Sequence, residues 1–184
     1  LLYQQGRLRI PGDDLAAGLY ETTQELTEAA GLPAYEISNH ARAGQESRHN
    51  LIYWRYGDYA GVGPGAHGRL TLFDRESGAD GRAATAAIRL PERWIDTVRR
   101  KGHGFAEIAP IGTSDGAREH LLMNLRLAEG LDLGAYATRW GTRPDARKVA
   151  VLSQQGFLTL KDDVLTATPA GRLLLNRVIS ELLN

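Results

Sequence analysis

Leucines recur at helical spacing in the first clear segment of the chain. Over residues 13–31 they follow a period close to 3.6, and glycine and proline at positions 31 and 33 end the pattern, which predicts a helix. In the following stretch, 34–38, Tyr35 and Ile37 alternate with polar neighbours, and this favours a strand. A helix, a short turn and a strand make one step of an α/β sheet or barrel.

The middle of the chain mixes loop signals with ordered segments. Glycines and polar residues break any period over residues 39–66, so we expect a loop with short ordered pieces. Runs at 67–73 and 82–90 predict two strands joined by a turn at 74–81. A helix is expected over 91–102, because a proline suits the first helical turn and apolar residues then share one face.

From about residue 113 the pattern becomes mostly helical. The predicted elements are helices over residues 113–130, 132–141 and 143–156, a hairpin over 157–168, and a last helix capped by Thr168 with Pro169 in its first turn. Three helices, a hairpin and a helix form a winged-helix-like arrangement. We therefore expect a mixed α/β (α+β) chain that divides near residues 103–112, where glycine and proline indicate a linker.

Composition narrows the classes of function. The 184 residues carry 22 Lys and Arg against 22 Asp and Glu, and this balance argues against a general nucleic-acid binder. There is no cysteine, so the chain itself holds no disulfide, no thiolate nucleophile and no thiolate metal site. No apolar run reaches transmembrane length, and no signal peptide is visible. Because the sequence opens on Leu1 and not on methionine, we expect it to be a piece of a longer protein.

The most informative stretch is residues 48–68, RHNLIYWRYGDYAGVGPGAHG. An imidazole such as that of His49 can ligate iron, act as a base or cap a backbone carbonyl. Tyr53 and Trp54 bring flat apolar faces close in sequence, and such faces suit a flat apolar ligand such as a porphyrin, with the imidazole as axial ligand. A small aromatic core that anchors the loop would give the same pattern, and the two interpretations can hold together.

Glycines dominate the second half of this stretch. Gly61, Gly63 and Gly65 permit positive φ and a close approach of backbone to a ligand. Their Gly-x-Gly-x-Gly spacing precedes an expected strand, so the dinucleotide-binding fingerprint is not met. The turn either lines a pocket for an adenosyl group or another small ligand, or forms a tight entry to a strand. His67 is open to both interpretations.

Two further features have alternative interpretations. Glu36 would lie near the carboxyl end of its predicted strand, where barrels bind ligands, although its alternation with Tyr35 and Ile37 also suits a solvent-facing side chain. From Thr113 onward there are nine Lys and Arg against eight Asp and Glu, a weaker basic excess than DNA-binding modules carry. A packing or interaction domain is therefore favoured over a DNA reader.

Residues 35–69, YEISNHARAGQESRHNLIYWRYGDYAGVGPGAHGR, closely resemble the oxygen-independent coproporphyrinogen III oxidase-like branch of the radical SAM family. Within it, the resemblance is closest to the HemW branch of heme chaperones. The segments LLMNLRLAEGLDL, GFLTL and LTATPAGRLLLNRVISELL are similar to the C-terminal domain of that family. The resemblance covers nearly the whole chain, and the motifs RHNLIYW and GVGPGAHG are specific in combination.

The resemblance implies a fold and a domain organisation. Proteins of this family have an N-terminal radical SAM domain, an incomplete α/β barrel whose three-cysteine motif holds a [4Fe-4S] cluster, and S-adenosylmethionine binds the open iron. Residues 1–105 would then be the last helix and strand of that barrel with the motif loop, the following strands and a helix. Residues 106–184 would be the winged-helix-like C-terminal domain, and the cluster ligands would lie outside this sequence.

The resemblance also implies site residues. In the heme chaperone branch the His-Asn-x-x-Tyr-Trp motif is linked to heme binding, and it carries over to His49, Asn50, Tyr53 and Trp54, with His49 as the expected iron contact. The glycine turn matches a segment near the cofactor pocket of the oxidase relatives. The candidate neighbours of S-adenosylmethionine are Gly61, Gly63, Gly65, Ala66 and His67. No catalytic residue is assigned, and no metal site is expected within the chain.

The implied function is that of a cytoplasmic radical SAM heme chaperone, which binds heme and delivers it to hemoproteins such as respiratory enzymes. We expect no nucleic-acid partner and at most peripheral contact with a membrane. The alternative is an oxygen-independent coproporphyrinogen III oxidase, which decarboxylates two propionate groups through a 5′-deoxyadenosyl radical. The RHNLIYW run favours the chaperone. A third hypothesis, a winged-helix regulator, predicts salt-sensitive DNA binding by residues 113–184.

Overall fold

The computed structural model describes residues 5, 10–74 and 79–184. The chain forms two compact units, Leu1–Ser47 and Arg48–Asn184. The division predicted between residues 105 and 106 falls inside the second unit and stays a prediction. The turn predicted at 74–81 is described only in part, because residues 75–78 lie outside the described residues.

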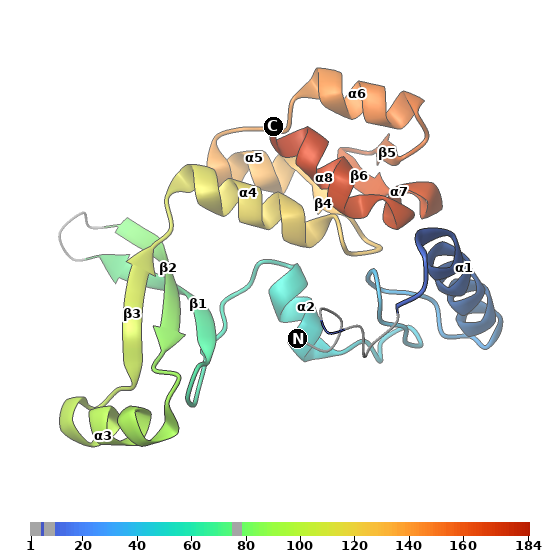
Figure 1. Ribbon diagram of the computed structural model, residues 1–184. Coiled ribbons are helices and arrows are strands. Elements are labelled where there is room, and N and C mark those ends of the chain that lie inside the picture. The colour runs from blue at the N-terminus through green and yellow to red at the C-terminus, as the bar shows by residue number, and fades with distance from the viewer. Residues whose placement is uncertain (1–4, 6–9, 75–78) are drawn as a thin grey trace. The chain divides into compact units, whose positions relative to one another are not determined.

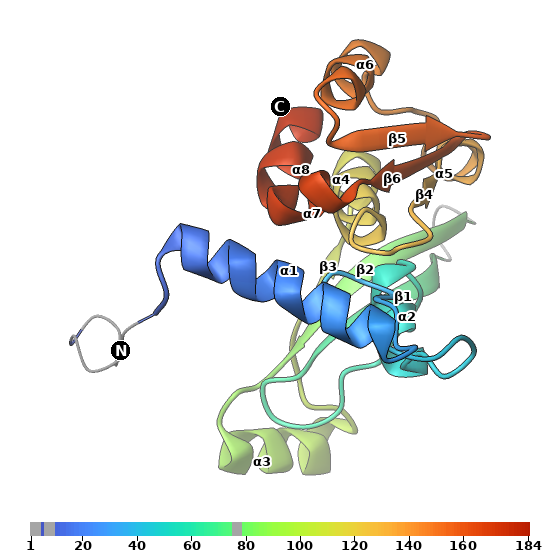
Figure 2. The same cartoon turned by 90° about the vertical axis from the view of Figure 1, so that its right-hand side faces the viewer.

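The first unit contains one long helix, α1 (Asp13–Ala29), and this confirms the helix predicted there (Figure 2). Two aspartates occupy its first turn, where negative side chains interact favourably with the helix dipole. Its leucine stripe is exposed, and Leu15, Leu19 and Leu26 are each more than half accessible. The periodicity of the leucines therefore predicted the helix correctly, although the helix has no buried residue.

The strand predicted at 34–38 is wrong in detail. No continuous strand forms there among the described residues: Ala34 makes an isolated antiparallel bridge with His40, Glu36 takes part in a second single bridge, and the Tyr35 amide donates to the Asn39 carbonyl at 3.1 Å. The chain folds back on itself within six residues. A run of alternating residues forms an extended strand only when a neighbouring strand pairs with it. Here the chain turns back instead, so that Ala34 bridges to His40.

The second unit contains a three-stranded antiparallel sheet in the order β1-β2-β3 (Figure 1). Its strands are β1 (His67–Asp74), β2 (Ala79–Ala87) and β3 (Phe105–Pro110), and the helix α3 (Pro91–Lys101) connects β2 to β3. The segment 103–112 contains β3, so it is not an irregular linker, and a domain division there stays a prediction. The backbone of β3 pairs with β2 from Ala87 back to Ala83, so these residues are held by a sheet ladder despite their glycine and proline neighbours.

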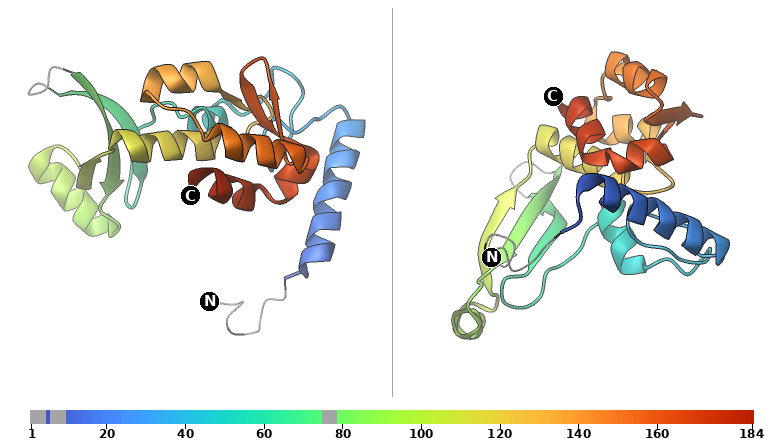
Figure 3. Two further views of the ribbon diagram at one scale, coloured as in Figure 1. Left: turned by 90° about the horizontal axis from the view of Figure 1, so that it is seen from above. Right: turned by 45° about the vertical axis from the view of Figure 1, so that its right-hand side comes forward.

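Strand β3 leads into the helical C-terminal part, where α8 packs against α4 and α6 (Figures 1 and 3). The helices are α4 (Thr113–Asn124), α5 (Leu133–Trp140), α6 (Ala146–Gln154), α7 (Pro169–Leu173) and α8 (Leu175–Leu183). The strands β4 (Leu131–Asp132), β5 (Leu158–Lys161) and β6 (Val164–Ala167) form a sheet in the order β4-β6-β5. The predicted succession of three helices, a hairpin and a terminal helix is confirmed, with the terminal helix divided at Leu174.

Two local details explain where these elements begin and end. The hairpin turns on Asp162 and Asp163, both at positive φ, which suits the primed turns of two-residue hairpins. Helix α4 ends at Asn124, six residues before the predicted end at Gly130, because Leu125 and Leu127 leave the helix to become fully buried. Together with Leu121, Leu131 and Leu165, they form the centre of the core of this part.

Candidate functional site

The predicted heme motif forms the short helix α2 (Arg48–Trp54). His49 and Tyr53 lie one helical turn apart, and their rings meet edge to face with centroids 4.6 Å apart. His49 is exposed, whereas Asn50, Tyr53 and Trp54 are half-buried. The imidazole is therefore accessible to a ligand and has an aromatic ring at its side.

A second aromatic ring extends this surface. Tyr53 meets Tyr59 edge to face with centroids 4.3 Å apart, and the backbone of Tyr59 bridges to Arg69 in β1. Burial raises the pKa of the Tyr59 hydroxyl, so this side chain stays neutral at physiological pH. His49, Tyr53 and Tyr59 thus form a continuous row of rings, which we call the α2 aromatic row.

The C-terminal end of α2 is fixed to α4. The side-chain amide of Asn124 donates to the Trp54 carbonyl at 2.6 Å, and the Arg126 guanidinium lies 5.8 Å from the centre of the Trp54 ring. Through both contacts, the last turn of α2 is attached to the helical C-terminal part. They give Trp54 a structural role, and the residue as a whole is half-buried.

Tyr56 is the buried anchor behind the motif. Only 3% of it is exposed, and it has positive φ, which is uncommon for a residue with a bulky side chain. Its ring stacks on His120 with centroids 5.2 Å apart, and the Arg82 guanidinium lies 3.9 Å from the ring centre. Burial, followed by the negative charge of Glu119, raises the pKa of Tyr56 to about 12.

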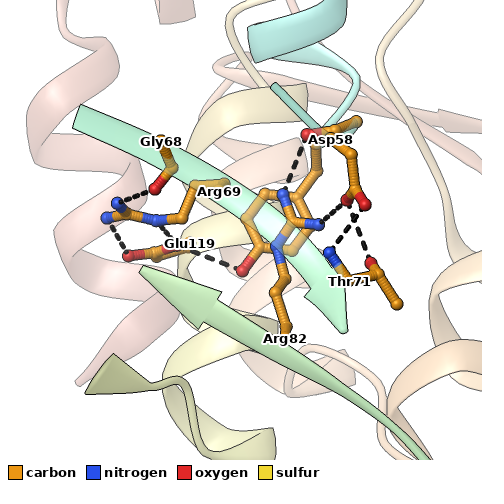
Figure 4. Close-up of polar contacts among 8 residues, drawn as sticks. Asp58, Gly68, Arg69, Thr71, Arg82 and Glu119 are labelled. Atoms are coloured by element: carbon orange, nitrogen blue, oxygen red, sulfur yellow. Dashed lines mark hydrogen bonds and ion pairs between the residues drawn. The ribbon is translucent and has the colours of Figure 1, made fainter. Parts of the chain in front are cut away.

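A polar network joins Tyr56 to the sheet and to α4 (Figure 4). Glu119 accepts hydrogen bonds from the Tyr56 hydroxyl at 3.1 Å and from Arg69 at 3.0 and 3.2 Å. Burial alone would raise the pKa of Glu119, but these donors and the nearby charges lower it overall. The carboxylate therefore stays ionised and ties α4 to β1.

Asp58 makes a second connection to the sheet, through Thr71 and Arg82 (Figure 4). It accepts from Arg82 at 2.7 Å and from the amide and hydroxyl of Thr71 at 2.6 and 2.9 Å. Burial acts to raise the pKa of Asp58, and the Thr71 and Arg82 donors outweigh it and lower the pKa. Arg82 also donates to the Gly57 carbonyl at 2.9 Å, so Gly57 and Asp58 are both fixed to the sheet.

Sequence reasoning missed this network. The motif itself does not single out Tyr56, and its partners Arg82, Glu119 and His120 are distant in sequence. The available signal was the aromatic residue followed directly by Gly57 and Asp58, a combination typical of a fixed turn. Nothing in the sequence indicated which distant charges would meet there.

His120 is neutral in this cluster. The Trp140 indole N–H donates to His120 Nδ1 at 2.8 Å, and a protonated Nδ1 could not accept that bond. Burial, together with the positive charge of Arg139, lowers the pKa of His120 to about 4. A protonated His120 would carry a positive charge near those of Arg139 and Arg82. Its Nδ1–H would also face the Trp140 indole N–H, and two donors cannot hydrogen-bond to each other.

This gives a pH prediction. The unfolded chain binds the His120 proton near pH 6.5 and the folded chain only near pH 4, so the free energy of unfolding falls as the pH drops between these values. The loss is at most about 1.4 kcal/mol for each pH unit. Urea titrations from pH 7 to pH 4.5 should show a smaller loss in His120→Gln than in wild type. The exposed control His103→Gln should follow wild type, and equal slopes in all three proteins would contradict this account.

Backbone geometry explains why glycines recur in the turn at residues 61–68. A Cβ on Gly61 would lie 2.3 Å from the His67 carbonyl oxygen, and one on Gly68 would lie 2.6 Å from the Thr85 hydroxyl. Gly63 and Gly65 have φ of 104° and 72°, a region that favours glycine. The strand-entry interpretation therefore accounts for these residues. Their assignment to S-adenosylmethionine stays a prediction.

Ala66 and His67 lead from the turn into the sheet. The Ala66 carbonyl accepts from the Ala87 amide at 2.8 Å, which closes the start of the β1–β2 ladder. His67 is exposed and lines an open cavity of about 470 Å³ with Arg89, Arg93 and Glu107. The structure thus places His67 beside β2, α3 and β3 and not in the α2 aromatic row.

Glu36, in the first unit, is fully buried, and the solvent-facing alternative for it is wrong. Its Oε1 accepts from the Ser38 amide and hydroxyl, both at 3.1 Å, and from the Asn39 side chain. Its Oε2 has no hydrogen-bond partner among the residues that the structure describes. The carboxylate builds the turn that brings His40 back to Ala34. Its ligand-binding role stays a prediction.

The described residues hold no cluster of three or more His, Cys, Asp or Glu that fits a metal ion. Within the same residues, no helix is long and apolar enough to cross a membrane. With no cysteine in the sequence, the side chains present do not fit the thiolate ligands of an iron–sulfur cluster.

The chain is similar to several known proteins. The family described as HemN C-terminal domain matches residues 114–174. A Bos taurus protein, radical S-adenosyl methionine domain-containing protein 1, mitochondrial, is 34% identical over 98% of this chain and 42% of its own length. The heme chaperone HemW of Bacillus subtilis is 31% identical over 99% of this chain and 46% of its own length. The chain thus spans less than half the length of these relatives.

A solved structure extends the likeness to the fold. The Escherichia coli coproporphyrinogen III oxidase HemN, described as a radical SAM enzyme, aligns with a TM-score of 0.68 and 15% sequence identity. The alignment covers 97% of this chain and 44% of that one. At this identity the match shows the arrangement of helices and strands.

Proposed function

Because this chain belongs to the HemN/HemW-like radical SAM family, we propose that it is the C-terminal portion of a heme chaperone, which binds heme and transfers it to hemoproteins. The observation that carries the proposal is the accessible imidazole of His49 at the end of the α2 aromatic row. Heme needs an axial ligand and apolar contact for its macrocycle. The row offers both on one short helix and its following loop.

Each motif residue has a distinct role in this proposal. His49 ligates the heme iron, and Tyr53 holds the imidazole plane by its edge-to-face contact. Trp54 fixes the end of the helix through its carbonyl and its cation contact, and this half-buried residue adds apolar surface. Asn50 lies on the same face as Trp54, one turn earlier, and is proposed to hydrogen-bond the ligand or the loop.

The cofactors of the family belong elsewhere in the proposed protein. A [4Fe-4S] cluster would need thiolates that this sequence does not contain. The residues proposed to lie near S-adenosylmethionine are Gly61, Gly63, Gly65, Ala66 and His67. The proposed recipients are hemoproteins such as respiratory enzymes, and the proposed location is the cytoplasm.

A specific observation supports an alternative function. The solved structure that shares this fold is described as a coproporphyrinogen III oxidase, and the alternative is that activity, the oxidative decarboxylation of two propionate groups. The experiment uses the full-length protein, of which this chain is proposed to be the C-terminal portion, reconstituted anaerobically with its cluster. It is offered coproporphyrinogen III with S-adenosylmethionine in one arm. In the other arm it is loaded with heme and mixed with a heme-free b-type hemoprotein.

The two functions predict opposite results. A chaperone passes heme to the recipient, seen as the appearance of the recipient's own absorption spectrum, and leaves coproporphyrinogen unchanged. Formation of protoporphyrinogen without heme transfer would assign the enzyme function instead. A gel-shift titration of residues 113–184 with duplex DNA tests the regulator hypothesis. Salt-sensitive binding there would contradict the packing role of this part.

A further inference from the structure

A groove lies between α6 and α8, and none of its lining residues belongs to the α2 aromatic row. It encloses about 510 Å³, which lies within the range of small-molecule sites. The apolar residues that line it, which we call its floor, are Val151, Leu152, Phe157, Leu174 and Val178. Val151 and Leu174 are each 50% exposed, so an apolar ligand would remove accessible hydrocarbon from water.

The rim of the groove is positively charged. Arg147, Lys148 and Arg177 line it with a single carboxylate, Glu181, which leaves a net charge of +2. Glu181 pairs with Arg177 one helical turn away. Neither Arg147 nor Lys148 has an ion-pair partner among the residues that the structure describes. Arg147 and Lys148 therefore lie beside the apolar floor with no ion-pair partner among the described residues.

We propose that this groove binds an amphipathic carboxylate, with its apolar body on the floor and its carboxylate against Arg147 and Lys148. The charge of the rim selects an anion, and the size and apolarity of the floor select a body larger than a simple ion. The floor and rim offer no imidazole, thiol or thioether, so binding does not require iron. Two sources share this chemistry, a fatty acid and a tetrapyrrole with propionate groups.

The experiment titrates the protein with two probes, laurate by calorimetry and metal-free protoporphyrin by fluorescence. We expect at least one of them to bind, and the tighter of the two identifies the source. Val151→Glu places a carboxylate on the floor at a half-exposed position and should weaken that binding by about tenfold or more. Leu160→Glu is the matched control, because Leu160 is 49% exposed, belongs to β5 and lies outside the groove.

The controls separate this site from the proposed heme site. His49→Ala should leave the groove affinity unchanged, so loss of heme binding and loss of groove binding are independent results. Arg147→Gln combined with Lys148→Gln should weaken the same probe by about fivefold or more, whereas Lys161→Gln should not. The proposal is overturned if neither probe binds, or if Val151→Glu and Leu160→Glu bind the probes as wild type does.

Discussion

Replacing His49 with alanine is expected to lower the affinity of the protein for heme by about tenfold or more, which corresponds to about 1.4 kcal/mol. The substitution removes the axial ligand and leaves the apolar surface of Tyr53 and Tyr59 in place. Because the side chain of His49 is exposed, its removal creates no cavity and should not change the free energy of unfolding. Heme titration followed by absorption spectroscopy measures the affinity, and a urea titration checks stability.

The matched control is His103→Ala. His103 is also exposed and also lies beside an aromatic ring, with its centroid 5.5 Å from that of Phe105, but it lies outside the motif. The control should bind heme as wild type does. Equal losses in the two variants would mean that heme associates with any exposed imidazole, and unchanged binding in both would remove His49 from the site.

Replacing Tyr56 with alanine is expected to destabilise the protein by about 3–5 kcal/mol, the usual cost of deleting a buried aromatic side chain. The ring fills the space between Arg82 and His120, and its loss leaves Arg82, whose side chain is 5% exposed, without that contact. The expected result is a large shift of the urea midpoint with loss of heme binding, because the loop behind α2 loses its anchor.

Tyr56→Phe separates packing from hydrogen bonding. It keeps the ring and removes only the bond from the hydroxyl to Glu119, so the expected cost is about 0.5–1.5 kcal/mol. Heme affinity should stay near wild type in this variant. If Tyr56→Ala lowers the free energy of unfolding by less than the roughly 0.5–1.5 kcal/mol expected for Tyr56→Phe, then Tyr56 is not the anchor that the geometry indicates.

The helices and hairpins were predictable because their information is local. A proline in the first turn, a threonine cap and a leucine period specify α3, α7 and α8 within a few residues. The strand β3 was missed because glycine and proline at 103–112 resemble a linker, and only the pairing partner β2 shows that the segment is extended. The prediction of a strand around Ile37 was wrong for the same reason, because the sequence of one segment does not specify which strand it pairs with.

The candidate site was predictable to the extent that it lies in one segment. His49 and Tyr53 are four residues apart, so a single helical turn brings their rings together. The network around Tyr56 draws on β1, β2 and α4 through Arg69, Arg82 and Glu119. Tyr56 and Glu119, which are 63 positions apart, meet there, and no local pattern predicts such a meeting. The groove between α6 and α8 likewise becomes visible only after both helices are packed.

The most direct test of the heme proposal is chemical rescue of the variant His49→Gly. The wild-type protein should give a ferric heme complex whose electron paramagnetic resonance spectrum shows a histidine ligand. The variant should lose that signature, and free imidazole in solution should restore it together with heme affinity. A histidine signature that persists in His49→Gly without added imidazole would contradict the account, because the iron would then be held by another residue.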